Sequence, residues 1–178
     1  MIFPKNKKRF RYKKGVVVYN TVSSDIALAH ERTCKMGVLS NSYTHGVGRM
    51  TGFLGEIAVN LYLPKSKYVG SAEHSFDILY RKKRIEVKSK TCAGLPEPHY
   101  NAFVNSKKDA EHDNDIYFFT RVRRDLQRVY LVGWLPTATL FNKAKFFHRG
   151  DKDPTGFQFK SSGYVIPIED LSPPKNLK

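Results

Sequence analysis

Three charged side chains in the stretch 76–90 have the types that metal-assisted hydrolysis requires: Asp77, Glu86 and Lys88. The stretch reads as two short strands, and we predict a two-residue turn at residues 82–83. Asp77 then faces Lys88 across the ladder, and the three charged side chains share one face of the hairpin. Carboxylate oxygens are the ligands that Mg2+ prefers, and the lysine would lie beside one of the waters of the ion.

The same pairing separates this polar face from an apolar one. In the predicted register, Leu79 faces Glu86. The opposite face carries apolar and aromatic side chains, which predicts that it packs on a core: Ile78, Tyr80, Ile85 and Val87. Charged residues on the wet face of a hairpin are also common in proteins without a site, where a cross-strand ion pair contributes only about 0.2–1 kcal/mol. The hairpin alone leaves that structural role open.

A helix with an acidic residue beside its apolar face precedes the hairpin. The sequence predicts this helix from about residue 49 to residue 63, where Pro64 follows. Its apolar face is formed by Phe53, Leu54, Ile57, Ala58 and Leu61. Gly52 and Gly55 each weaken a helix by about 1 kcal/mol relative to alanine, so we expect a close approach to another element. Glu56 either reaches a metal held by the hairpin or faces water.

The order and spacing of these residues resemble the core of the PD-(D/E)XK nuclease superfamily. A helix carries Glu56, Asp77 comes next, and the triplet 86–88 supplies Glu-Val-Lys on the following strand. The resemblance covers residues 46–90. It implies an α/β (α+β) fold of the restriction-endonuclease type, with a mixed central β-sheet flanked by helices in αβββαβ order. Phe76 departs from the proline that often precedes the aspartate in this family.

The resemblance also implies a catalytic site. Glu56, Asp77 and Glu86 would bind Mg2+, with Mn2+ as a substitute, and Lys88 would help to activate the attacking water. The four residues would then form the catalytic set of an endonuclease that hydrolyses DNA. Lys90 stands where some family members have glutamine or another polar residue, and the resemblance leaves its role open.

The composition predicts a polyanionic partner. The chain has 31 Lys and Arg residues against 16 Asp and Glu, a formal net charge of +15. We expect DNA, with RNA not excluded, and no membrane partner, because no apolar stretch is long enough to span a bilayer. The predicted nucleic-acid contacts are Lys7, Lys8, Arg9, Arg11, Arg49, Arg81, Lys82, Lys83, Arg84 and Lys90.

We expect a single domain at residues 16–170, between a basic arm at 1–15 and a tail at 171–178. Hydrophobic periodicity predicts further helices at about 23–36 and 137–147, and strands at about 100–105, 115–122, 128–134 and 163–168. The strand at 100–105 is expected to continue the sheet of the hairpin. The strands at 115–122 and 128–134 are almost continuously apolar, which predicts central strands that are covered on both faces.

Two cysteines, Cys34 and Cys92, are too few for a disulfide framework or a zinc site. They favour an intracellular, cytoplasmic protein with reduced thiols. A basic nucleic-acid-binding protein that keeps this fold but does not cleave is an alternative function, and a basic structural protein of a virion or nucleoid is another. A homodimer is also open, because one metal site cuts only one strand.

Overall fold

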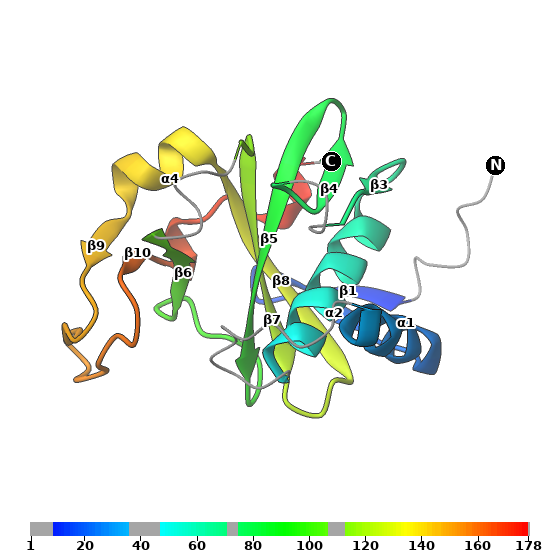
Figure 1. Ribbon diagram of the computed structural model, residues 1–178, viewed down its shortest axis with the longest axis horizontal. Coiled ribbons are helices and arrows are strands. Elements are labelled where there is room, and N and C mark those ends of the chain that lie inside the picture. The colour runs from blue at the N-terminus through cyan, green and yellow to red at the C-terminus, as the bar shows by residue number, and fades with distance from the viewer. Residues whose placement is uncertain (1–8, 36–46, 71–74, 107–112, 178) are drawn as a thin grey trace.

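A computed structural model describes residues 9–35, 47–70, 75–106 and 113–177 of the chain. This described part is a mixed α/β protein with a seven-stranded mixed sheet, a three-stranded sheet and three α-helices (Figure 1). The large sheet has the order β1-β2-β8-β7-β5-β4-β3, and the small sheet has the order β6-β10-β9. The helices are α1 (Ser23–Lys35), α2 (Val47–Tyr62) and α4 (Thr137–Lys143). The strands are β1 (Phe10–Lys13), β2 (Val16–Asn20), β3 (Lys67–Tyr68), β4 (Ile78–Tyr80), β5 (Lys83–Cys92), β6 (Asn101–Asn105), β7 (Ile116–Arg123), β8 (Arg128–Pro136), β9 (Lys145–Phe147) and β10 (Gly163–Pro167).

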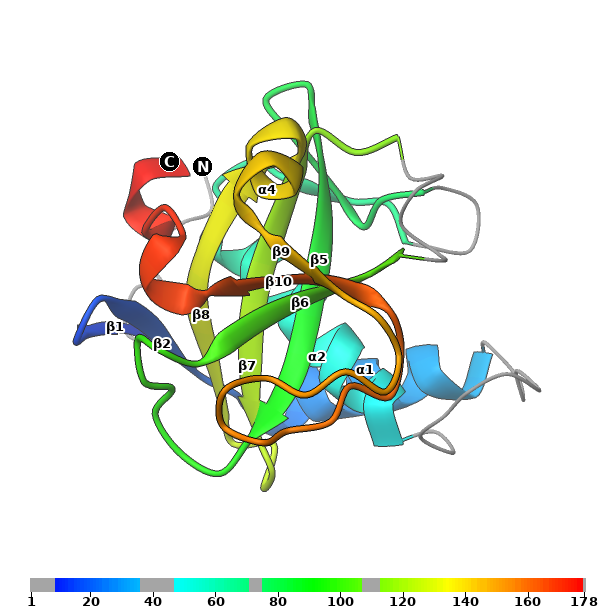
Figure 2. The ribbon, with the colours of Figure 1, turned by 90° about the vertical axis from the view of Figure 1, so that its left-hand side faces the viewer.

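Apolar cores lie on both faces of the large sheet. On one face, Leu54 and Ile57 of α2 pack in a core with Ile85 of β5. On the other face, the small sheet and α4 cover Tyr117 and Phe119 of β7, so that the sheet is the middle layer of three (Figures 1 and 2). Strands β7 and β8 are therefore buried along nearly their whole length. This confirms the prediction that they are central strands.

Helix α2 lies directly against β5 and β7 because Gly55 has no side chain. A Cβ at this position would overlap Ser89 Oγ of β5 and Thr120 Oγ1 of β7. Close approach at Gly55 is therefore confirmed. The other predicted contact is wrong, because a Cβ on Gly52 would have Glu56 Oε1 as its nearest neighbour, at 4.0 Å.

Strands β3, β4 and β5 form an antiparallel meander, and β7 continues the sheet in parallel with β5. The strand predicted at 100–105 is observed as β6, but it does not join this sheet. It pairs with β10, where Ala102 lies opposite Ile166. The alternating pattern of β6 correctly indicates a strand, but it carries no information about the partner strand. Ala102 and Val104 are buried in the core on the small-sheet side.

The hairpin turn lies one residue earlier than predicted. Its two central residues are Arg81 and Lys82, with φ angles of 48° and 64°. Leu79 therefore faces Arg84 rather than Glu86. A two-residue hairpin turn of this kind needs a left-handed backbone, which Asn or Gly usually signals, and a run of four basic residues contains no such marker. Moving the turn by one residue shifts the pairing by two, so every side chain keeps its predicted face.

Helix α4 ends at Lys143, four residues before the predicted end at 147. Ala144 already has an extended backbone, with φ of −73° and ψ of 141°. The following residues form β9, which pairs with β10 so that Phe146 lies opposite Tyr164. A strand edge that is distant in sequence thus overrides the helical pattern of this segment.

Both ends of the described chain form backbone hydrogen bonds with strands of the large sheet. Residues 10–13, within the predicted arm, pair with β2, whereas residues 1–8 of that arm lie outside the described residues. Arg9 forms an ion pair with the buried Asp25. At the other end, Ser172 exchanges two backbone hydrogen bonds of 3.0 Å with Trp134. The segment predicted to be a tail is therefore packed on β8.

The two cysteines are both free thiols, Cys34 on α1 and Cys92 at the end of β5. Cys34 is exposed, and Cys92 is half-buried. Within the described ranges, no helix combines the length and the apolar character needed to cross a membrane.

Candidate active site

Asp77 is fixed at the beginning of the hairpin by backbone hydrogen bonds. Its N–H donates to the carbonyl of Ile85 at 3.0 Å, and its own carbonyl accepts from the N–H of Val69 at 2.9 Å. Its side-chain Oδ2 accepts from the N–H of Val87 at 2.8 Å. The residue is only 2% exposed. Asp77 was predicted to face Lys88. The observed register pairs Ile78 with Ile85 instead, and the carboxylate of Asp77 is bonded to the backbone of Val87.

Glu86 and Lys88 project from the same side of β5, because they are two residues apart in a strand. Lys88 Nζ donates to Glu86 Oε1 at 2.9 Å. Glu86 is buried, while 26% of the Lys88 side chain is exposed. The predicted apolar face of the hairpin is confirmed, since all its members are buried: Ile78, Tyr80, Ile85 and Val87.

Glu56 reaches the hairpin from α2, one residue after the close contact at Gly55. It is buried, and its carboxylate accepts a hydrogen bond from the hydroxyl of Tyr68 in β3. The guanidinium of Arg32 in α1 lies 3.6 Å from the centroid of the Tyr68 ring. Within the described part of the chain, Oε2 of Glu56 has no hydrogen-bond partner. One oxygen of a buried carboxylate is thus unsatisfied, which is costly unless another group binds it.

The three carboxylates influence one another electrostatically. Burial raises the pKa of Glu56 to about 7, and the charge of Glu86 adds to the rise, while the hydrogen bond from Tyr68 opposes it. Burial likewise raises the pKa of Asp77 well above its usual range, and the charges of Glu56 and Glu86 raise it further. Lys88 opposes both shifts. The charge of Arg32 also lowers the pKa of Glu56, but the net effect of burial and of the neighbouring carboxylates is to favour the protonated forms of Glu56 and Asp77 when no further cation is near.

A divalent cation fits the chemistry of this donor set. The unsatisfied Oε2 of Glu56 and the raised pKa of Asp77 both indicate negative charge that a cation would stabilise. No three His, Cys, Asp or Glu side chains in the described ranges lie close enough together to enclose a metal by themselves. Mg2+ does not need such a cage, because it usually keeps several waters and uses one or two carboxylates with substrate phosphate. Of Glu56, Asp77 and Glu86, one or two would bind the ion directly, and the others would bind through its waters.

Comparison with known proteins adds no family to this geometry. No protein-family model matches the chain, and a search of curated proteins finds no match. A functional assignment must therefore come from the side chains and their arrangement.

The predicted nucleic-acid-binding residues occupy several different environments. Those at the hairpin turn and on β1 are exposed: Arg81, Lys82, Lys83 and Arg11. Arg49 is half-buried in the first turn of α2, and Lys90 lines a cavity at the far end of β5. Lys7 and Lys8 lie outside the described residues. The exposed group can meet a phosphate backbone without rearrangement of the fold.

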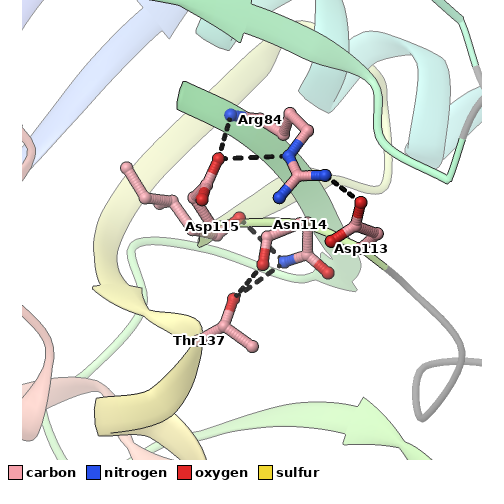
Figure 3. A network of polar contacts seen from close by, with 6 residues as sticks. Arg84, Asp113, Asn114, Asp115 and Thr137 are labelled. Carbon is pink, nitrogen blue, oxygen red and sulfur yellow. Dashed lines mark hydrogen bonds and ion pairs between the residues drawn. The ribbon is translucent and has the colours of Figure 1, made fainter. Parts of the chain in front are cut away.

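Arg84 instead belongs to a polar network that ties the beginning of β5 to the beginning of β7 (Figure 3). Its backbone N–H donates to Asp115 Oδ2 at 2.8 Å, and its Nε donates to the same oxygen at 3.2 Å. Its guanidinium also forms an ion pair with Asp113. Thr137 extends the network to α4, because its N–H donates to the carbonyl of Asp115 at 3.0 Å. These contacts give Arg84 a structural role.

Sequence analysis missed three residues near the site: Arg32, Tyr68 and Arg121. Arg32 lies on α1 and Tyr68 lies on β3. The sequence pattern of neither element indicates that the two side chains are in contact. Arg121 does have a signal, since it is a charged residue within a strand whose other central residues are apolar or aromatic apart from Thr120. It is only 6% exposed. A buried cation in a central strand is a candidate functional residue.

Proposed function

We propose that this chain is a metal-dependent endonuclease that hydrolyses phosphodiester bonds in DNA. The observation that carries the proposal is that buried Glu56 and Asp77 each interact electrostatically with Glu86 and Lys88, which are hydrogen-bonded to each other. Buried carboxylates with one ammonium beside them suit a site where a cation and a phosphate are both bound.

The order of the elements supports a relationship to the PD-(D/E)XK nucleases. Helix α2 is followed by the antiparallel strands β3, β4 and β5, and β7 then lies parallel to β5. This agrees with the helix, the three strands and the final strand of the αβββαβ order. The connection from β5 to β7 contains β6, which joins the small sheet instead, and residues 107–112, which lie outside the described residues. Under this proposal, the family motif corresponds to Glu56 on α2, Asp77 before β4 and the pair Glu86 and Lys88 on β5.

Under this proposal, each side chain has a task. When bound, Mg2+ would polarise the phosphodiester and lower the pKa of the attacking water. Lys88 would orient that water and offset the negative charge that develops on the phosphoryl oxygens. Glu86 keeps the Lys88 ammonium in position through the 2.9 Å hydrogen bond. Asp77 is held just as firmly, because its Oδ2 is bonded to the backbone of β5.

The charge of the whole chain supports DNA as the substrate. A formal net charge of +15 attracts a phosphate backbone over a distance, and the attraction weakens as salt is added. Arg81, Lys82 and Lys83 form an exposed cationic turn on the hairpin that carries Asp77 and Glu86. These residues would bind the backbone of the strand to be cut without reading its sequence.

The test is a cleavage panel. The purified protein is incubated with supercoiled plasmid, linear duplex, single-stranded DNA and RNA, in Mg2+, in Mn2+ and in EDTA. We expect metal-dependent cleavage of DNA, which Asp77→Ala and Lys88→Ala should abolish while DNA binding is largely kept. Undiminished cleavage by either variant would refute the assignment. A wild-type protein that binds DNA but cuts none of the substrates would instead be a non-cleaving binder.

A further inference from the structure

A cavity of about 450 Å3 is lined by residues from the end of β5, from β6 and from the loop between β9 and β10. Lys90, Arg121, Tyr100 and Phe157 are among its lining residues. A smaller cavity of about 270 Å3 shares Lys90 and Arg121 with it and reaches Lys88. The two cavities are therefore neighbours, and the smaller one contacts the proposed catalytic lysine. A volume of this size suits one small organic group.

Two cationic side chains line both cavities. Lys90 lies opposite Arg121 in the parallel pairing of β5 with β7, and Lys90 is on the same side of β5 as Lys88. Arg121 donates a hydrogen bond to the carbonyl of Asn101. Within the described residues, neither Lys90 nor Arg121 forms an ion pair. Lys90 is exposed over part of its surface, and Arg121 is buried. Burial lowers the pKa of Arg121. Partial burial also lowers the pKa of Lys90, and the charge of Arg121 lowers it further, while the charge of Asp153 opposes the shift. An anion placed between them would relieve this repulsion.

The cavity also presents aromatic rings to solvent. Phe157 is 49% exposed and Tyr100 is 43% exposed, although both are large aromatic side chains. Lys90 Nζ lies 5.5 Å from the centroid of the Phe157 ring. Asp153, which also lines the cavity, is occupied by its own loop, since its Oδ1 accepts from the N–H groups of Thr155 at 2.9 Å and of Phe157 at 3.1 Å. The loop therefore holds Phe157 in place.

We propose that this cavity binds one unpaired nucleotide of the DNA strand being cut, with its phosphate at Lys90 and Arg121 and its base stacked on Phe157. The inference rests on the proposed nuclease function and narrows its substrate to single-stranded or locally unpaired DNA. A cationic groove with aromatic side chains is the usual platform for single strands. A base within a duplex would first have to unpair and unstack, which is unfavourable in free energy and is not needed for an unpaired base.

Binding in EDTA tests the inference without cleavage. Fluorescence anisotropy compares a labelled single-stranded oligonucleotide with one of equal length and charge whose central positions are abasic. We expect the abasic strand to bind roughly tenfold more weakly to the wild-type protein, because a stacked base is lost while the phosphates remain. Phe157→Ala should bind the two strands almost equally. Phe146→Ala is the matched control: Phe146 is 38% exposed on β9, lies outside the lining of the cavity and should keep the tenfold difference.

The outcomes separate the two proposals. Equal wild-type affinity for the intact and abasic strands, or a full difference retained in Phe157→Ala, would overturn the nucleotide site even if the protein cleaves DNA. Preferential binding of RNA of the same sequence would overturn the assignment to DNA. A tenfold difference that depends on Phe157, in a protein without metal-dependent cleavage, would keep the nucleotide site and reject the nuclease. A thermal unfolding midpoint for Phe157→Ala equal to that of Phe146→Ala confirms that both variants are folded.

Discussion

Oδ2 of Asp77 accepts a hydrogen bond of 2.8 Å from the backbone N–H of Val87, the residue between Glu86 and Lys88. The bond connects the acidic residue before β4 to the Glu-Val-Lys segment of β5 through main-chain atoms. It therefore sets the position of Asp77 independently of any ion. We propose that a cation would bind the other carboxylate oxygen, Oδ1. Burial first, and then the charges of Glu56 and Glu86, raise the pKa of Asp77, so ionised Asp77 is destabilised when no cation is bound.

Asp77→Asn should abolish activity without weakening the fold. The amide oxygen can still accept from Val87, but the metal loses a charged ligand, so cleavage should fall at least about 100-fold. In EDTA the variant should unfold at the same temperature as the wild type or higher, because a desolvated charge has been removed. Differential scanning calorimetry with and without Mg2+ measures this. A variant that is much less stable in EDTA would show that the carboxylate has a mainly structural role.

Lys88→Met tests the ammonium separately from the metal ligands. The methionine keeps most of the aliphatic stem, so the cleavage rate should fall roughly 10²–10³-fold while Mg2+ affinity changes little. Lys13→Met is the matched control, because it removes the same charge from an exposed strand position outside the predicted nucleic-acid contacts. Single-turnover kinetics and metal titration give the two quantities. Equal losses in both variants would indicate a general effect of charge rather than a role for Lys88.

The metal-free protein should lose stability as the pH rises. Burial raises the pKa of Glu56 from 4.5 to about 7, so the folded state keeps a proton that the unfolded state has released. Stability therefore falls between about pH 4.5 and pH 7, by at most about 3 kcal/mol for this group, and Asp77 acts in the same direction. Urea unfolding in EDTA from about pH 5 to about pH 8 measures the trend.

Mg2+ and Glu56→Gln should each reduce that pH dependence. The cation favours the charged carboxylate and stabilises the folded state by binding to it. The glutamine cannot titrate, so its curve in EDTA should be flatter than that of the wild type. A wild-type curve that rises with pH over this range would contradict the proposed desolvation of Glu56.

Arg84 should prove structural, although the sequence analysis placed it among the nucleic-acid contacts. Its hydrogen bonds lower the pKa of Asp115, with the backbone N–H of Arg84 as the main cause, and Figure 3 shows them joining two strands. Arg84→Ala should lower the unfolding temperature by a few degrees. Lys82→Ala, at the exposed turn, should instead reduce the salt dependence of DNA binding by about one phosphate contact with little change in stability. DNA titrations at several salt concentrations distinguish the two variants. A reduced salt dependence in Arg84→Ala, with unchanged stability, would show that Arg84 contacts DNA after all.

Local patterns were enough to place the residues of the site on their elements, but not to place the elements in the sheets. The period of α2 and the alternation of the hairpin depend on neighbouring residues, so burial of Ile57 and Ile85 could be predicted. The partner of β6 depends on β10, about 60 residues later, and the two-residue strand β3 is too short to have a pattern. The contact of Tyr68 with Glu56 follows from β3, and it was missed for the same reason.

Gly55→Ala should destabilise the protein and disturb the site, whereas Gly52→Ala should not. Both substitutions favour a helix by about 1 kcal/mol, so their difference isolates the packing of α2 on the sheet. At position 55 the added Cβ would overlap Ser89 Oγ and Thr120 Oγ1, whose mutual hydrogen bond of 2.8 Å joins β5 to β7. We expect a net loss of roughly 1–3 kcal/mol from this overpacking.

The same displacement should reduce cleavage, because Glu56 follows Gly55 directly and would move away from Asp77 with the helix. At position 52 the nearest atom to an added Cβ lies 4.0 Å away, so Gly52→Ala should be neutral or slightly stabilising and remain active. Urea unfolding and the plasmid cleavage assay, applied to both variants, give stability and activity in parallel. If Gly55→Ala were as stable and as active as Gly52→Ala, the close contact of α2 with β5 could not be what positions Glu56.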